Sequence, residues 1–445
     1  MPLKDIAAVP LPHQVRQREQ GWVSETHSPK PSNIFLKLAA IERAKSISHA
    51  FLSKSLGSRS SSFIRPRTRK QKKKQIWASI PECLSSVKTD QLRCTVRQLM
   101  LPGLGILAAD DSINQLGLRL NAIHLENTAI NRRRYHEMLL NIDGASYGRL
   151  NDYLSGVLMR EESMDQTGYS GKNLSQLLKE RNVLLGIRFD KALEKLVGCD
   201  REYIASGLDS LSESIRRMKD IGVKFGLFRC VYRISDHTPS RLALTENSIV
   251  LARFAVICQQ LTIVPILAPE VLAGGNHGYE EARGVLRDIL TTLVKIMSEH
   301  RVYLAGAIIR VAACSPGLCF KDHRDLKRVA NNMAKTLNES IPPAIGGILM
   351  SRQESLCESV AILNNIQICR VKKPFIVSFC FSRVIQQGVD SIWAGQNKNL
   401  DKARAELMRR AELCGLAAMG QWLNEATSIF ISVESSTSLS ETLSD

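Results

Sequence analysis

The sequence predicts an α/β protein built as a single (β/α)8 TIM barrel, preceded by a disordered, basic N-terminal extension. From about residue 85 onward, short apolar runs alternate with amphipathic stretches. Strands that alternate with helices imply parallel pairing. Eight such units over about 300 residues fit a closed barrel. A doubly wound open sheet is the alternative, but no Gly-x-Gly-x-x-Gly pattern follows the first apolar run.

The composition is that of a globular protein with an unusual N-terminus. The chain has 445 residues, of which 44% are hydrophobic and 23% charged, and its net charge is +17. Residues 1–90 hold 17 Lys and Arg against 6 Asp and Glu, so most of the excess lies there. We therefore expect an extension over residues 1–78, a barrel over 79–425 and a flexible C-terminal tail over 426–445.

The densest basic run is Arg65–Lys74, and such a run repels itself and stays solvated. It is typical of nuclear-localisation signals and nucleic-acid patches, whereas the alternative is a disordered tail of no specific role. Asp5, Glu19 and Glu25 argue against a mitochondrial presequence. A short helix is expected around Ile34–Ala50. We expect a cytoplasmic protein, with a nuclear location open through residues 65–74.

The chemistry-bearing residues exclude several classes of site. The 11 cysteines form no Cys-x-x-Cys pair, which is typical of reduced thiols in the cytosol or nucleus. The nine histidines show no metal-ligand spacing, so neither a metal nor a cofactor is expected. No apolar run reaches the roughly 18 residues of a membrane span.

The elements follow from the pattern in chain order. The eight expected strands are Gly105–Asp110, Leu154–Met159, Leu184–Asp190, Phe225–Arg233, Ile263–Glu270, Ala305–Arg310, Gly346–Ser351 and Phe375–Arg383. Helices are expected where apolar residues recur at three- and four-residue steps, over Ile204–Met218, Ile289–Ile296 and Leu326–Leu337. A last helix is expected from about Lys402 to Trp422.

Charged residues end several of these strands, namely Asp110, Arg188 with Asp190, Arg229, Glu270, Arg310 and Arg383. Barrel enzymes carry their chemistry at this end of the strands. Convergent charges there predict a polar, net cationic pocket that suits a phosphorylated small molecule. The alternative is a structural network of ion pairs that closes the barrel.

Ordered motifs over about residues 85–425 resemble the class I fructose-bisphosphate aldolases. They include Gly105–Ser112, Glu126-Asn127 with Asn131–Arg133, Gly207–Leu211, His237–Ser240, Leu251–Arg253 with Ile257–Gln260, Ile263–Ile266, Pro269-Glu270 and Ile341–Ala344. The resemblance implies a barrel of glycolysis that cleaves fructose 1,6-bisphosphate through a Schiff base.

The resemblance also implies which positions form the site. Asp110 matches the aspartate beside the Schiff base, and Arg229 and Glu270 match charged residues that hold the catalytic network. Ser112 and Arg119 match residues near one substrate phosphate, and Ser351 and Arg383 match groups that bind the other. Arg188 stands where the family has a lysine at the phosphate site.

Three departures fall on the reacting groups. Arg310 replaces the Schiff-base lysine, Leu227 replaces a second lysine, and Ala268 replaces the glutamate acid/base. A guanidinium keeps its proton, with a pKa above about 12, and cannot attack a carbonyl. Phosphate-loop glycines are replaced by Arg352, Gln353 and Ser382, and the chain ends in Asp445 rather than tyrosine. No convincing substitute amine is found, although Lys191 and Lys224 lie near the right strands.

Three hypotheses follow from the sequence. The first is a catalytically impaired aldolase homologue, a pseudoenzyme that still binds sugar phosphates or protein partners. The second is an active aldolase that releases dihydroxyacetone phosphate and glyceraldehyde 3-phosphate. The third is a non-enzymatic scaffold. The resemblance implies a homotetramer and actin binding, and the basic extension suits acidic partners or nucleic acid.

Overall fold

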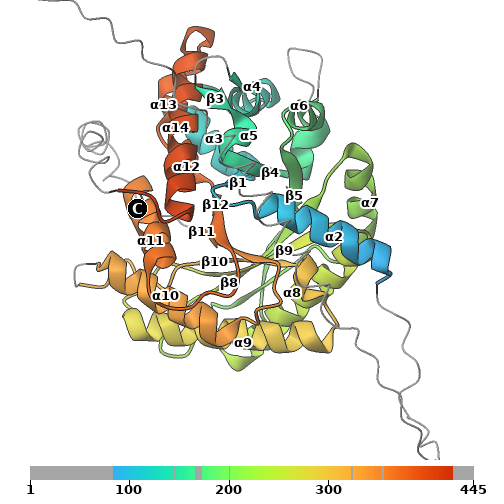
Figure 1. Cartoon of the computed structure of the whole chain (residues 1–445), viewed down its shortest axis with the longest axis vertical. Coiled ribbons are helices and arrows are strands. Elements are labelled where there is room, and N and C mark those ends of the chain that lie inside the picture. The colour runs from blue at the N-terminus through green and yellow to red at the C-terminus, as the bar shows by residue number, and fades with distance from the viewer. Residues whose placement is uncertain are drawn as a thin grey trace, which may run out of the picture. The chain divides into compact units, whose positions relative to one another are not determined.

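The computed structural model describes residues 84–144, 147–165, 173–199, 201–321, 324–351 and 355–423 (Figure 1). The chain divides into two units between Ile76 and Trp77, and every described residue belongs to the second unit. The expected N-terminal extension, its basic run Arg65–Lys74, the expected helix at Ile34–Ala50 and the tail 426–445 therefore lie outside the described residues.

Eight parallel strands close into a barrel in the order β1-β12-β11-β10-β9-β8-β5-β4, which confirms the predicted (β/α)8 fold. Their bounds are β1 Gly105–Ala108, β4 Leu154–Arg160, β5 Leu184–Arg188, β8 Phe225–Tyr232, β9 Val264–Val271, β10 Ile308–Ala312, β11 Gly347–Ser351 and β12 Val377–Phe381. Two antiparallel hairpins lie outside the barrel, β2 Asp143–Gly144 with β3 Gly148–Arg149, and β6 Leu193–Lys195 with β7 Tyr203–Ala205.

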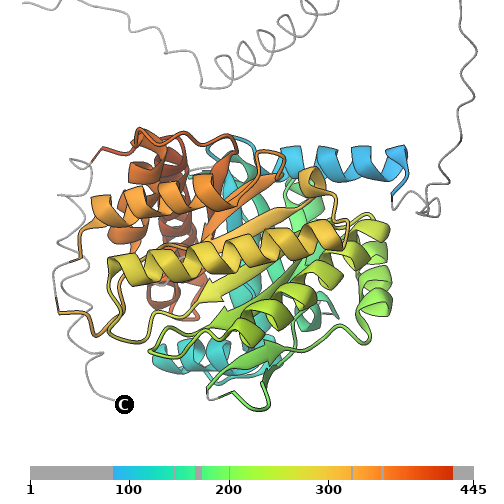
Figure 2. The same ribbon diagram turned by 90° about the horizontal axis from the view of Figure 1, so that it is seen from below.

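Helices surround the strands, and Figure 2 shows α9 and α10 (yellow and orange) side by side along the outside of the barrel. The α-helices are α2 Ser86–Leu99, α3 Ile113–Ala122, α4 Ala129–Leu140, α5 Leu150–Tyr153, α6 Leu174–Glu180, α7 Leu211–Ile221, α8 Arg241–Gln260, α9 Tyr279–Glu299, α10 Leu326–Ser340, α11 Leu356–Ile368, α12 Arg383–Gln386, α13 Val389–Trp393 and α14 Leu400–Ala418. Three 3-10 turns complete the order, η1 Glu161–Asp165, η2 Leu304–Gly306 and η3 Asn397–Asn399.

One described helix, α8, is long and apolar enough to cross a membrane by length and composition. It packs between β8, β9 and α9 as a member of the helical ring, and Leu251, Phe254 and Cys258 are fully buried there. Core helices of globular proteins pass the same test, so the apolarity of α8 is explained by the barrel it covers.

The N-terminal end of the barrel is sealed by α2. Leu92, Val96 and Leu99 on this helix join the apolar cluster that fills the barrel interior. The helix comes so close that a Cβ atom on Gly347 would lie 2.6 Å from Met100 Cε. Two side chains of this helix bond to neighbouring parts of the barrel: Lys88 Nζ donates to Gln260 O at the end of α8 at 2.7 Å, and Arg93 Nη2 donates to Tyr303 Oη at 2.7 Å.

Several expected element boundaries were wrong, and three of the errors place residues in a different element or position. Ala305 and Gly306 lie in η2, so β10 starts at Ile308 and Arg310 sits in the middle of the strand rather than at its end. Arg383 opens α12, because β12 ends two residues earlier at Phe381. Ile204 belongs to β7 and Leu208 precedes α7, so the apolar spacing across Gly207 joined a hairpin to a helix.

Candidate active site

Charged side chains from six neighbouring strands meet inside the barrel at its C-terminal end. Successive side chains of a strand point to opposite faces, so the residues that alternate with the outward-facing core point into the barrel. Phe228, Cys230, Leu267, Ile309 and Val311 pack outward against the helices. Their neighbours Arg229, Glu270 and Arg310 therefore face the interior, together with Asp110, Arg160 and Arg188.

Arg188, at the end of β5, is held by two aspartates. Its Nη2 donates to Asp190 Oδ2 at 2.6 Å, its Nε donates to the same carboxylate at 2.9 and 3.0 Å, and its Nη1 donates to Asp110 Oδ2 at 3.1 Å. Burial opposes the charge of Arg188, but Asp190 and Asp110 outweigh it and raise its pKa. Both acceptors are buried, so these hydrogen bonds are shielded from solvent.

A second pair joins β8 to β9. Arg229 donates from Nε to Glu270 Oε2 at 2.8 Å and from Nη2 to Oε1 at 3.0 Å. The Arg229 backbone N–H donates to Asp190 Oδ1 at 3.0 Å, which connects this pair to the Arg188 group. Burial opposes the ionisation of Glu270, but Arg229 and Arg310 prevail and lower its pKa.

Arg310, on β10, interacts electrostatically with a carboxylate of each group, Glu270 and Asp110. Burial opposes its charge, but the thiol of Cys380 and the carboxylates of Glu270 and Asp110 more than offset it, so its pKa is raised. Its Nε is buried without a hydrogen-bond partner. The neighbouring Cys380 is fully buried on β12, and burial raises its pKa to about 11. Neither Arg310 nor Cys380 therefore offers a nucleophile near neutral pH.

Below the charged groups the interior is apolar. Leu227 and Ala268 are both fully buried and share one cluster with Leu158, Ile266 and Leu349. A leucine and an alanine can neither donate nor accept a proton. None of the eight barrel strands contains a lysine, and Lys224 is exposed one residue before β8 at the opposite end of the barrel.

The expected phosphate-binding residues lie near the same rim, and two of them already serve local structure. Ser112 caps α3, where its hydroxyl accepts from Gln115 N at 3.2 Å. Arg119 pairs with Asp111 at 3.3 Å and donates to Tyr135 Oη at 3.2 Å. Ser351 is buried at the end of β11, and Arg383 is exposed at the start of α12.

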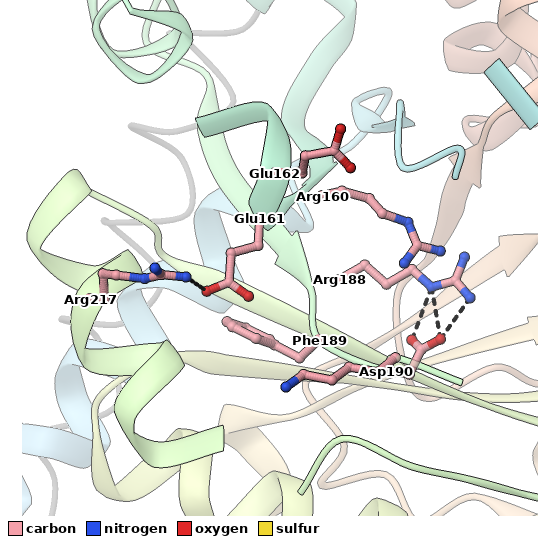
Figure 3. A pocket seen from close by; sticks show the side chains of 8 residues that line it. Arg160, Glu161, Glu162, Arg188, Phe189, Asp190 and Arg217 are labelled. Atoms are coloured by element: carbon pink, nitrogen blue, oxygen red, sulfur yellow. Dashed lines mark hydrogen bonds and ion pairs between the residues drawn. The ribbon is translucent and has the colours of Figure 1, made fainter. Parts of the chain in front are cut away.

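A cavity of about 330 Å³ opens where β4 and β5 end, and its lining groups come from β4, η1, β5 with the segment after it, and α7 (Figure 3). It is lined by Arg160, Glu161, Glu162, Arg188, Phe189, Asp190, Lys191 and Arg217. Arg217 pairs with Glu161, and Arg132 pairs with Glu162 at 3.5 Å. Among the described residues, neither Arg160 nor Lys191 is paired with a carboxylate, so the cavity keeps an excess of positive charge.

Sequence reasoning missed several of these cavity residues. The second expected strand ended at Met159, but β4 continues to Arg160, whose Nε donates to Asp110 O at 3.0 Å. Arg217 lies on a helix far along the chain, so only the fold brings it to Glu161. An arginine directly after an apolar strand was the one available signal. In the described part of the chain, no three His, Cys, Asp or Glu side chains are grouped to hold a metal ion.

The closed parallel barrel with a charged C-terminal rim defines the class of (β/α)8 proteins whose sites form at the strand ends. The family model of class I fructose-bisphosphate aldolase matches residues 91–439. The chain belongs to this family.

Known aldolases match over most of their length. Fructose-bisphosphate aldolase C-B of Danio rerio is 36% identical over 345 residues, 77% of this chain and 94% of the relative. Fructose-bisphosphate aldolase of Schistosoma mansoni is 37% identical over 340 residues, 76% of this chain and 93% of the relative. The solved fructose-bisphosphate aldolase of Plasmodium falciparum, in complex with TRAP and a small-molecule inhibitor, superposes with a TM-score of 0.74 at 32% identity, over 77% of this chain and 98% of that one.

Proposed function

We propose that this chain is a class I aldolase homologue that does not cleave fructose 1,6-bisphosphate and instead binds a phosphorylated small molecule at the barrel mouth. The observation that carries the proposal is that none of the eight described barrel strands contains a lysine. A Schiff base needs a deprotonated amine at the substrate carbonyl. The raised pKa of Arg310 leaves this group as a cation.

The loss extends beyond the nucleophile. Leu227 and Ala268 stand at the positions that resemble the family's second lysine and its glutamate acid/base, and both are fully buried in apolar surroundings. A positioned acid or base contributes about 10²–10⁴ in rate. A reaction that used another nucleophile would therefore still lack an acid or base at these two positions to transfer protons.

The retained charges support a binding role. Four cations line the cavity against three carboxylates, and Arg160 and Lys191 have no carboxylate partner among the described residues. Guanidinium and ammonium groups are suited to phosphate recognition. Because Arg188 already donates hydrogen bonds to two aspartates, we expect Arg160 and Lys191 to make the main contribution to binding an anion.

The test is chemical trapping. The purified chain and the Danio rerio aldolase C-B are each incubated with fructose 1,6-bisphosphate and borohydride, and intact masses are compared. We expect an adduct on the relative and none on this chain. An adduct on this chain would overturn the proposal of lost catalysis, and peptide mapping would identify the amine.

One observation favours the alternative of an active aldolase. Lys191 lines the cavity beside Arg188, and its Nζ donates to Ser210 Oγ at 3.0 Å. Triose-phosphate release that Lys191→Met abolishes, and that Lys195→Met on the exposed hairpin leaves intact, would establish this route.

A scaffold role rests on the basic residues before the barrel, and it makes a separate proposal. Residues 1–78 would bind acidic partners or nucleic acid and direct localisation. Removing residues 1–76 and measuring localisation and salt-dependent binding tests this role, because no change in either would exclude it.

A further inference from the structure

An apolar surface lies at the N-terminal end of the barrel, away from the cavity. It is formed by large side chains that are exposed although their type is usually buried: Leu101 at 48%, Ile376 at 47%, Ile368 at 60%, Met419 at 40% and Leu423 at 74%. We call these five residues the basal patch. Contiguous exposed apolar surface marks an interaction site, whereas single exposed residues do not. The basal patch therefore indicates an interaction site only if its residues form one continuous surface.

The basal patch is continuous because its three chain segments contact one another. Gly103 follows Leu101 and Pro102 in the chain. The Met419 sulfur lies 3.0 Å from where a Cβ atom on Gly103 would be, so Met419 packs beside this turn. Ile368 Cγ2 lies 3.1 Å from the corresponding point on Gly420. The Ser378 hydroxyl donates to Leu104 O at 2.5 Å, which fixes the start of β12, and with it Ile376, beside the same turn.

Positive charge borders the basal patch. Arg370 and Lys372 are exposed on the segment that joins Ile368 to Ile376. On the same segment, Lys373 Nζ donates to Cys369 O at 3.2 Å and to Val371 O at 3.0 Å. Arg97, in the last turn of α2, is exposed just before Leu101. The occupant of this surface should therefore combine apolar side chains with acidic ones.

The chain's own C-terminal segment has this composition. Residues 424–445 contain four acidic residues, Glu425, Glu434, Glu441 and Asp445, and no Lys or Arg. They also contain the apolar run Ile429-Phe430-Ile431 followed by Val433.

The same segment begins at the basal patch. The preceding Trp422 is buried, and its backbone N–H donates to Asn364 Oδ1 on α11 at 3.1 Å, so the chain is anchored at this point. An extended chain covers about 3.3 Å per residue, so residues 424–445 are long enough to cross the surface. Because the segment is tethered, its effective concentration at the surface is on the order of millimolar.

We propose that residues 424–445 bind the basal patch of their own chain. Ile429, Phe430 and Ile431 cover Leu101, Ile376 and Met419, while Glu425 and Glu434 approach Arg370 and Lys372. The contact occupies the end of the barrel opposite the cavity, so it does not depend on the proposed ligand.

The test is site-specific photo-crosslinking in the full chain. Benzoylphenylalanine replaces Ile376, and the control chain carries it at Leu318, which is 67% exposed in the segment after β10. After irradiation, products are separated by mass and the crosslinked peptides are sequenced. We expect the Ile376 probe, but not the Leu318 probe, to label residues 425–434 within chains of monomer mass.

A matched pair of variants tests the apolar part of the contact. Ile429→Ser with Ile431→Ser is expected to lower the yield from the Ile376 probe about tenfold or more, since two buried side chains are lost. Leu439→Ser with Leu443→Ser, outside the apolar run, is expected to leave the yield unchanged. Labelling found only in products of dimer mass would assign the patch to a second copy and overturn the proposal, as would a yield no higher than that of the Leu318 probe.

Discussion

At the scale of single residues, the interior of this barrel carries side chains that are either inert or permanently charged. Arg310 is a cation, and burial raises the pKa of the neighbouring Cys380 thiol to about 11. Leu227 and Ala268 are buried apolar side chains that can neither donate nor accept a proton. The proposed loss of the nucleophile and the proposed loss of the proton-transfer groups can therefore be tested separately, by introducing these groups one at a time.

Arg310→Lys alone is expected to give a borohydride-trappable adduct without appreciable turnover, because an amine then faces the substrate carbonyl but no proton is moved for it. Adding Leu227→Lys and Ala268→Glu is expected to raise the rate of triose-phosphate release about 10²–10⁴-fold over the single variant. A coupled assay measures the release. Equal rates in the single and triple variants would contradict this division of roles.

Glu270→Gln is expected to lower the free energy of unfolding by about 3 kcal/mol, because it leaves the partly buried guanidinium of Arg229 without its carboxylate. Urea denaturation measures the change. Glu162→Gln is the control, since this carboxylate is about half exposed in its pair with Arg132 and should change stability by less than about 0.5 kcal/mol.

The same pair predicts a pH dependence. The pKa of Glu270 is lowered in the folded chain, so its contribution is complete above the ordinary carboxyl pKa and is lost as the pH falls through the lower folded value. The difference in stability between wild type and Glu270→Gln should therefore be constant near neutral pH and shrink below about pH 4. A difference that grew on acidification would contradict the assignment.

At the scale of elements, the sequence identifies the strands but not their ends. Apolar runs locate all eight barrel strands, because buried parallel strands are apolar on both faces. Their bounds shift where a turn is itself apolar, as in the Leu304–Gly306 turn before β10. The hairpin of β6 and β7 escaped detection because its few residues carry no clear alternation.

Two glycines at this scale predict opposite effects of the same substitution. A Cβ atom on Gly186 of β5 would lie 2.0 Å from Phe225 Cε2, whereas one on Gly284 of α9 would meet no atom within 4 Å. Gly186→Ala is expected to destabilise the barrel by about 1–3 kcal/mol through overpacking. Gly284→Ala is expected to stabilise it by about 0.5–1 kcal/mol. Thermal unfolding of both variants checks the signs.

At the scale of the whole molecule, the sequence predicted the barrel, and the pattern of charges pointed to its C-terminal end. The partners within that site could not be predicted from the sequence. Arg217 reaches Glu161 from across the chain, and Arg188 is shared between Asp110 and Asp190, which lie 80 residues apart. Such pairings depend on strand register and on side-chain reach, which no local pattern encodes.

Ligand binding is predicted at this scale, because it draws on several elements. Fructose 1,6-bisphosphate at about 100 times its dissociation constant should stabilise the chain by about 2.7 kcal/mol. Thermal-shift titration should show this response weakened by Arg160→Ala and by added salt, which screens the charges. Arg97→Ala on α2 should leave it unchanged. A flat titration with the wild-type chain would favour a scaffold over a sugar-phosphate binder.

The helix that crosses the base of the barrel has a kinetic consequence. Because α2 closes that end with Leu92, Val96 and Leu99, no channel runs through the described barrel. Any molecule that enters from the C-terminal end of the barrel must leave by the same end, past the guanidinium groups of Arg160 and Arg188. The residues at this one opening would therefore govern both the residence time of a ligand and the choice of ligand.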